Sequence, residues 1–129
     1  MHKSRLYGIF VDVPVADASK AVDFWAGALG VTPVPGEDDD PYTVLPGAID
    51  GLSMEVQAVA DAPRYHLDIE TDDVAAEVHR LTDLGASEVV RHESWVVLRA
   101  LGGHLVCVVP VQSERDSFAA PARTWPTVG

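Results

Sequence analysis

The stretch VDVPVADASKAVDFWAGALG at residues 11–30 passes from a strand-like run into an amphipathic helix. Asp17 is a suitable N-cap, because its carboxylate can accept hydrogen bonds from backbone N–H groups that the first helical turn leaves unpaired. Gly30 is a suitable end, because glycine readily adopts the left-handed conformation that stops a helix. The apolar residues between them recur at helical spacing and predict one buried stripe, formed by Ala18, Val22, Trp25 and Leu29.

The stretch YHLDIETDDVAAEVHRLTDLGA at residues 65–86 repeats this order. Asp72 or Asp73 can cap the second helix, and Gly85 can end it. The interval between cap and glycine is the same in both helices, which indicates an internal duplication. The apolar stripe predicted for the second helix consists of Val74, Val78 and Leu81.

Each helix is preceded by one strand-like run and followed by three shorter ones, so the pattern is βαβββ twice. We therefore expect a single α+β domain over residues 1–129, with module one at about 5–60 and module two at about 64–110. Residues 112–129 lack periodicity and are expected to form a C-terminal tail. Trp125 in that tail is an apolar anchor for this chain or a partner, unless the end is mobile.

Composition narrows the function classes. The chain of 129 residues contains 9 Lys and Arg residues and 20 Asp and Glu residues, which gives a formal net charge of −11. Such a surface repels nucleic-acid phosphates and anionic lipid, so we expect neither partner. The single cysteine cannot form an internal disulfide, and no apolar run is long enough to cross a bilayer. A cytoplasmic location is the expectation.

Strand alternation assigns side chains to two faces of the predicted sheets, because successive residues point to opposite sides. One face is aliphatic and suits the helix stripes, with Val11 and Val56 as examples. The other face is mixed, with a histidine, carboxylates, an amide, a thiol and aromatic rings, and we expect it to line a ligand cavity. Its candidate site residues are Phe10, Glu55, Gln57, His66, Trp95, Arg99 and Cys107.

The aromatic and cationic candidates suggest ligand contacts. Phe10 and Trp95 can stack on a planar ligand, although core or dimer packing would also account for them. Arg99 can pair with an anionic ligand group, and a surface salt bridge is the alternative. The histidines outside the strands are expected at the surface, namely His2, His79 and His92.

A metal site from Glu55, His66 and Cys107 is chemically consistent, because zinc accepts carboxylate, imidazole and thiolate ligands. Each residue has a plainer alternative. Cys107 suits a small buried position in a valine-rich strand, and His66 can be a neutral histidine bonded to a neighbouring carboxylate. Glu55 can be a solvated strand residue, or it can serve as a catalytic base.

The two segments at residues 11–30 and 65–86, with SWVVLRALGGHLVCVVP at residues 94–110, resemble the vicinal oxygen chelate superfamily of glyoxalases, bleomycin-resistance proteins and dioxygenases. The resemblance covers about residues 5–110 and is to the glyoxalase-like two-module subgroup. It implies cupped mixed sheets with helices on the outer face, and a homodimer that completes each cup.

The resemblance places metal ligands on the first and last strands of each module. In this chain those positions fall on Phe10, Glu55, His66 and Cys107, with Gln57 as an alternative to Glu55. Phe10 cannot ligate a metal, and Cys107 stands where a glutamate is usual. The turn RALGG also departs from the Asp-Pro-x-Gly pattern of the family.

These departures favour a small-molecule-binding protein that lacks a complete metal site, with a cationic or neutral aromatic ligand in an acidic cavity. The alternative is a metal-dependent lyase, isomerase or dioxygenase that uses His66 and Glu55 with one divalent metal ion. A scaffold or partner-binding role is a third possibility.

Overall fold

The computed structural model describes residues 1–127 and divides into two compact units. We call Gly8–His66 the β1–β4 unit, and Met1–Tyr7 with the chain from Leu67 onward the β5–β8 unit. Strands β1 (His2–Pro14) and β5 (Arg64–Thr71) each contribute residues to both units. Among the described residues, none of the helices is long and apolar enough to cross a membrane.

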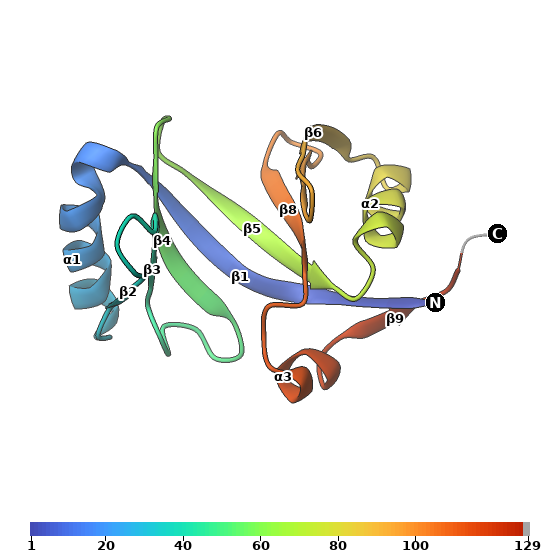
Figure 1. Cartoon of the computed structure of the whole chain (residues 1–129), viewed down its shortest axis with the longest axis horizontal. Coiled ribbons are helices and arrows are strands. Elements are labelled where there is room, and N and C mark those ends of the chain that lie inside the picture. The colour runs from blue at the N-terminus through green and yellow to red at the C-terminus, as the bar shows by residue number, and fades with distance from the viewer. Residues whose placement is uncertain (128–129) are drawn as a thin grey trace. The chain divides into compact units, whose positions relative to one another are not determined.

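The β1–β4 unit is a mixed sheet with a helix on one face (Figure 1). Its strand order is β1-β4-β3-β2, in which β1 and β4 are parallel and the other neighbours are antiparallel. Aliphatic side chains of β1 and β4, including Val11 and Val56, pack with Ala26 of the helix. The remaining elements are η1 (Val15–Asp17), α1 (Ala18–Leu29), β2 (Val34–Pro35), β3 (Tyr42–Val44) and β4 (Ser53–Val59).

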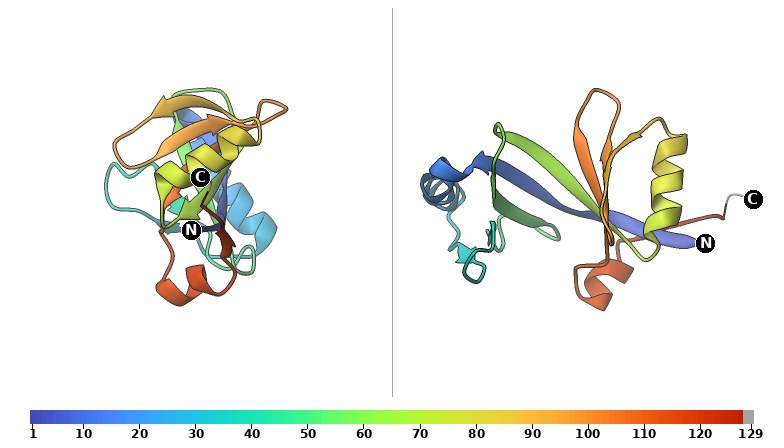
Figure 2. Two further views of the ribbon diagram at one scale, coloured as in Figure 1. Left: turned by 90° about the vertical axis from the view of Figure 1, so that its right-hand side faces the viewer. Right: turned by 45° about the horizontal axis from the view of Figure 1, so that its top comes forward.

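The β5–β8 unit repeats this topology (Figure 2). Its order is β5-β8-β7-β6, again with one parallel pair, β5–β8, and antiparallel neighbours beyond it. Val78 of the helix packs on Val96, Leu98 and Val108. The predicted α+β class with two βαβββ modules is therefore confirmed. The elements are α2 (Val74–Asp83), β6 (Ser87–Arg91), β7 (Val96–Arg99) and β8 (Leu105–Pro110).

The helix ends follow the predicted signals in part. The Asp73 carboxylate accepts a hydrogen bond from the Ala76 N–H at 3.0 Å, and Gly30 is left-handed with φ of 69°. Asp17 makes no such side-chain bond, because it closes the 3-10 turn that leads into α1. Leu29 lies in the last turn of α1, outside the core cluster, and is exposed, so the predicted stripe ends one turn too late.

The residues after position 112 carry regular structure that the sequence pattern did not indicate. They form α3 (Arg115–Ala119) and β9 (Arg123–Trp125), and β9 pairs antiparallel with the start of β1. Trp125 packs on this chain: its indole N–H donates to Ser4 Oγ at 2.8 Å, and the Arg80 guanidinium lies 3.8 Å from its ring centroid.

A buried charge network lies beneath this C-terminal strand. The His2 ring is 2.7 Å from Glu77 Oε1, and Arg80 donates two hydrogen bonds to the same carboxylate, at 2.8 and 2.7 Å. The expectation that His2 lies at the surface is wrong, because β9 pairs with its strand and Glu77 binds its ring. Burial raises the pKa of Glu77, but hydrogen bonds from Arg80, His2 and Ser4 outweigh it, so the pKa lies below its ordinary value.

The close approach of β1 and β4 at Gly8 generates a first prediction. A Cβ on Gly8 would lie 2.6 Å from the Ser53 carbonyl oxygen. Gly8→Ala should therefore lower the free energy of unfolding, measured by urea denaturation, by about 2 kcal/mol. In the control variant, Gly27→Ala in α1, no described atom outside the neighbouring residues and the nearby backbone of the helix lies within 4 Å of the new Cβ, and the free energy of unfolding should rise by about 1 kcal/mol. Equal effects of the two substitutions would contradict this packing.

Glu77 generates a prediction for acid stability. Because its folded-state pKa is depressed, its contribution is present above the unfolded-state pKa and is lost as pH falls through the folded-state value. Glu77→Gln should cost about 3 kcal/mol at neutral pH, and its stability should fall less steeply below pH ~5 than that of the parent chain. Glu88→Gln removes an exposed pairing with Arg91 and should change stability by less than about 1 kcal/mol. If the free energy of unfolding of Glu77→Gln falls with decreasing pH as steeply as that of the parent chain, ionised Glu77 does not make the assigned contribution to stability.

Candidate functional site

The face of the β1–β4 unit opposite its aliphatic core carries polar and aromatic side chains. Phe10 is the register partner of Glu55, and Asp12 is the register partner of Gln57, on the parallel pair β1–β4. The alternate residues on these strands, such as Val11, belong to the core on the helix side. Alternation therefore divides this sheet as predicted, into an aliphatic side and a mixed side.

Asp12 is the most deeply buried ionisable group on this face, with 2% of its surface exposed. His66 Nδ1 donates to Asp12 Oδ2 at 2.8 Å, since an ionised carboxylate can only accept. The Arg64 Nε lies 3.5 Å from the same oxygen. None of the described residues donates a hydrogen bond to the other oxygen, Oδ1, although it is buried. Asp12 therefore has one paired oxygen and one to which none of residues 1–127 donates.

An aromatic cluster adjoins this carboxylate. The His66 ring stacks on Phe10 with a centroid distance of 4.7 Å and an interplanar angle of 9°. Tyr42 approaches Phe10 edge-on at 5.9 Å and 80°. Phe10 is buried, so it supplies an apolar surface beside the polar groups.

Glu55 is buried on the same face and accepts a hydrogen bond from Ser53 Oγ at 2.9 Å. The solvated-strand alternative for Glu55 is therefore wrong. Gln57 is partly buried and pairs in register with both Asp12 and Tyr42. His66 is hydrogen-bonded to the carboxylate of Asp12, which agrees with the alternative that it is a histidine bonded to a neighbouring carboxylate.

Arg64 connects this buried face to the surface. Its side chain is 39% exposed, and its Nη1 donates to Asp61 Oδ2 at 2.9 Å. A hydrogen bond from the Ala62 N–H, followed by the Arg64 bond and charge, lowers the pKa of Asp61. Arg64 thus faces one exposed carboxylate, Asp61, and one buried carboxylate, Asp12.

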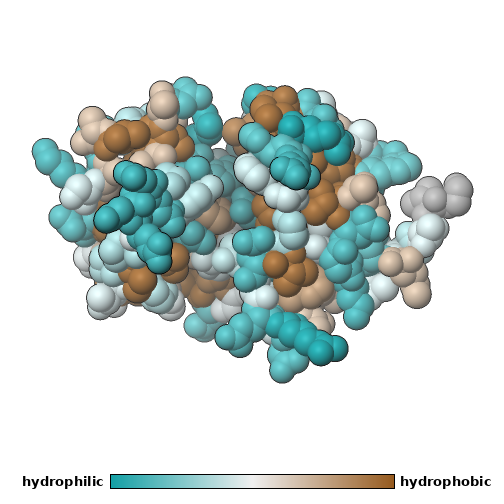
Figure 3. All heavy atoms as spheres, in the orientation of Figure 1, coloured by the Kyte–Doolittle hydropathy of each residue, from teal (hydrophilic) through white to brown (hydrophobic). Residues whose placement is uncertain are grey.

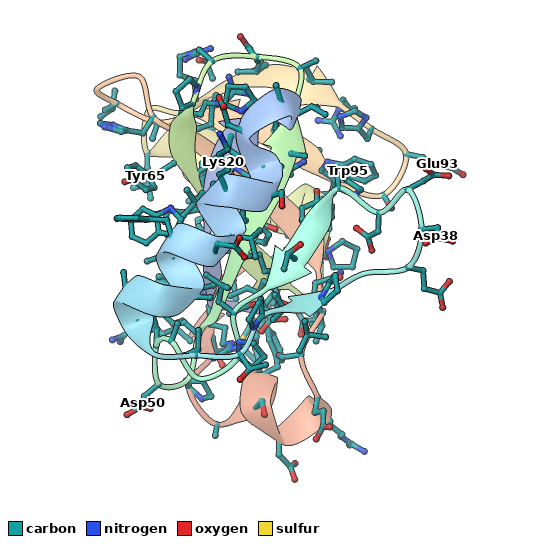
Figure 4. All side chains as sticks on the ribbon, turned by 90° about the vertical axis from the view of Figure 1, so that its left-hand side faces the viewer. Lys20, Asp38, Asp50, Tyr65, Glu93 and Trp95 are labelled. Carbon is teal, nitrogen blue, oxygen red and sulfur yellow. The ribbon has the colours of Figure 1, made fainter. Side chains whose placement is uncertain are left out.

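The remaining candidates belong to the β5–β8 unit. Trp95 lies in the loop between β6 and β7 near Glu93 (Figure 4), is 38% exposed, and stacks on His92 with centroids 4.1 Å apart. Arg99 is exposed and donates to the Gly103 carbonyl at 2.9 Å, within the β7–β8 turn. This hydrogen bond within the turn explains the position of the Arg99 side chain, and no ligand is needed to explain it.

Cys107 and Asp68 are register partners on β8 and β5, and their ligand atoms lie within 4.8 Å of each other. His66 stands two residues before Asp68 on β5, so alternation directs both to the same side of that strand. Thiolate with carboxylate or imidazole is a donor set that zinc accepts. The predicted ligand set of His66, Glu55 and Cys107 stays a prediction.

Three functional candidates were not singled out from the sequence: Asp12, Arg64 and Asp68. Strand parity already places Asp12 with Phe10, and Asp68 with His66, so the face was predictable. Their pairing with residues on other strands was not, because parity carries no information about neighbours across a sheet.

The family model of the glyoxalase-like domain matches residues 8–109. No curated protein matches the sequence. Among solved structures, a hypothetical protein from Bacillus halodurans aligns at 14% identity, covering 86% of this chain and 96% of its own, with a TM-score of 0.62. Methylmalonyl-CoA epimerase from Mycobacterium tuberculosis aligns at 20% identity, covering 83% and 88%, with a TM-score of 0.54.

A Streptomyces coelicolor methylmalonyl-CoA epimerase variant in complex with 2-nitronate-propionyl-CoA aligns at 15% identity, covering 82% of this chain and 93% of its own, with a TM-score of 0.54. At these identities the structural likeness shows the fold alone. Because the family model spans both βαβββ modules, the chain belongs to the glyoxalase-like domain family of the vicinal oxygen chelate superfamily.

Proposed function

We propose that the β1–β4 unit binds a small organic molecule that combines a cationic hydrogen-bond donor with an apolar, aromatic body. One observation carries the proposal: buried Asp12 has an oxygen to which no described residue donates. A buried acceptor without a donor costs about 1–3 kcal/mol, and more when it is charged. A ligand ammonium or amidinium N–H would recover that free energy.

The surroundings of Asp12 support the same ligand class. Tyr42, which is 36% exposed, offers aromatic surface for the body of a ligand, buried Phe10 backs it, and Glu55 adds a second buried carboxylate on the same face. A predominantly apolar wall with a few placed polar groups is typical of small-molecule sites. The net charge of −11 also attracts cations over a wider range.

Part of the attraction of cations comes from the overall negative charge of the chain, so a test of Asp12 needs a control for net charge. Hydrophilic side chains cover much of the face shown in Figure 3, and Asp38 and Asp50 point away from the ribbon in Figure 4. An exposed aspartate such as Asp38 therefore offers a matched comparison for Asp12, because its replacement removes the same charge from a solvated loop.

Benzylamine, which is cationic at neutral pH, is a suitable probe. It should raise the melting temperature of the parent chain with increasing concentration, whereas neutral benzyl alcohol should have a smaller effect. Asp12→Asn should weaken benzylamine binding, measured by calorimetric titration, by about tenfold or more, because it removes a charged acceptor. Asp38→Asn should bind like the parent. Equal losses in both variants would mean that benzylamine responds only to net charge.

A second candidate function is a metal-dependent lyase, isomerase or dioxygenase that uses His66, with Glu55 as ligand or general base. Two observations favour it. The Asp12–His66 hydrogen bond is of the kind that orients metal-binding histidines, and Asp68 lies beside Cys107 on neighbouring strands. A bound divalent ion would act as a Lewis acid on a substrate oxygen. Asp12 would then fix the orientation of the His66 ring.

Metal analysis of chain purified without a chelating column distinguishes the two candidates. The metal-dependent function predicts stoichiometric zinc or another divalent ion, lost in His66→Ala and reduced in Cys107→Ser. The exposed His79 provides the control, and His79→Ala should keep the metal. If the purified chain carries no metal and its melting temperature is unchanged by zinc, nickel or manganese, the metal-dependent candidate is eliminated.

A further inference from the structure

We infer that Arg64 is an internal competitor for the charge of Asp12: its guanidinium lies beside Oδ2 of the carboxylate that a cationic ligand would bind through Oδ1, and it gives up that contact and keeps its bond to Asp61 when the ligand binds. The inference rests on the proposed function and adds a residue that sets the affinity of that site.

The position of Arg64 carries the first step. Arg64 begins strand β5, and its side chain is 39% exposed, whereas the Asp12 side chain is only 3% exposed. Arg64 and His66 both lie near Asp12 Oδ2, and Arg64 is the more exposed of the two because His66 is buried. A cationic ligand bound to Asp12 would therefore share the carboxylate with a partly solvated guanidinium.

The two contacts of Arg64 differ in quality. The Nε of Arg64 lies 3.5 Å from Asp12 Oδ2, beyond the 2.7–2.9 Å of a strong charge-assisted hydrogen bond. Its Nη1 donates to Asp61 Oδ2 at 2.9 Å, which lies within that range. The contact with Asp12 is thus the weaker of the two, and a second cation on Oδ1 of the same carboxylate would weaken it further by repulsion between like charges.

Asp61 makes the displacement inexpensive. Asp61 is 71% exposed at its side chain, and its lowered pKa keeps it ionised through the neutral range. When Arg64 leaves Asp12, its guanidinium keeps one carboxylate and gains solvent, so no charge is left buried and unpaired. Asp12 in turn keeps its bond from His66 and receives the ligand cation.

Removal of Arg64 is expected to raise the affinity for the ligand. Removal of a site residue normally weakens binding, but removal of a competitor strengthens it. Arg64→Gln should bind benzylamine about fivefold more tightly than the parent chain, a modest gain because the pair is partly screened by solvent. Neutral benzyl alcohol should gain less than about twofold, because it does not replace a charge.

Three variants test this by calorimetric titration with benzylamine at fixed ionic strength. Arg64→Gln should show the gain, and Arg64→Lys, which keeps a cation beside Asp12, should stay close to the parent. Arg91→Gln removes the same charge from an exposed pair with Glu88 and should leave binding unchanged. Urea denaturation of each variant accompanies the titrations, and Arg64→Lys supplies a second readout if Arg64→Gln is poorly folded.

The outcomes separate the two proposals. Tighter binding by Arg64→Gln but not by Arg91→Gln supports the inference, including the case in which only Arg64→Gln binds measurably. Binding by the parent with an equal or weaker affinity in Arg64→Gln overturns the inference and leaves the proposed function intact. Absence of benzylamine binding in every variant overturns both.

Discussion

The structure of the candidate site depends on one constraint: side chains alternate across the parallel pair β1–β4. Because Val11 and Val13 must pack toward α1, Phe10 and Asp12 are held on the opposite face. A one-residue slip would bring Asp12 into the aliphatic core and expose the valines. Gly8 admits the close approach of the two strands at its register partner, Ser53. The hydrophobic core thus determines where the buried carboxylate points.

A few charged and polar groups determine the electrostatics of that face. Asp12 Oδ2 is approached by His66 Nδ1 and, more loosely, by Arg64, while Oδ1 has no donor among the described residues. A buried carboxylate of this kind favours whatever cation or donor can reach it. The β5–β8 unit solves the same problem differently. Its buried Glu70 accepts hydrogen bonds from Arg5, Ser113 and the backbone N–H of Gln112. Both of its carboxylate oxygens therefore have donors from the chain itself.

Local signals predicted the elements well, and long-range pairing explains what they missed. Helical spacing, Asp73 and Gly30 located α1 and α2, and strand parity located the face of Phe10, Glu55 and His66. The burial of His2 was not predicted, and packing of Trp125 on this chain was only one of the alternatives, because both result from pairing between the two ends of the chain. The role of Asp12 was equally hidden, since its partners lie 52 and 54 residues along the chain, at Arg64 and His66.

The central claim is that a cationic ligand is recognised at one buried carboxylate and not by the acidic surface as a whole. The most direct test is to map amide chemical shifts by NMR while benzylamine is added to the ¹⁵N-labelled chain. We predict saturable shifts that cluster at Phe10–Asp12 of β1 and at Glu55 of β4. Unsaturable shifts spread over the exposed acidic loop at Glu37–Asp40 would contradict the account.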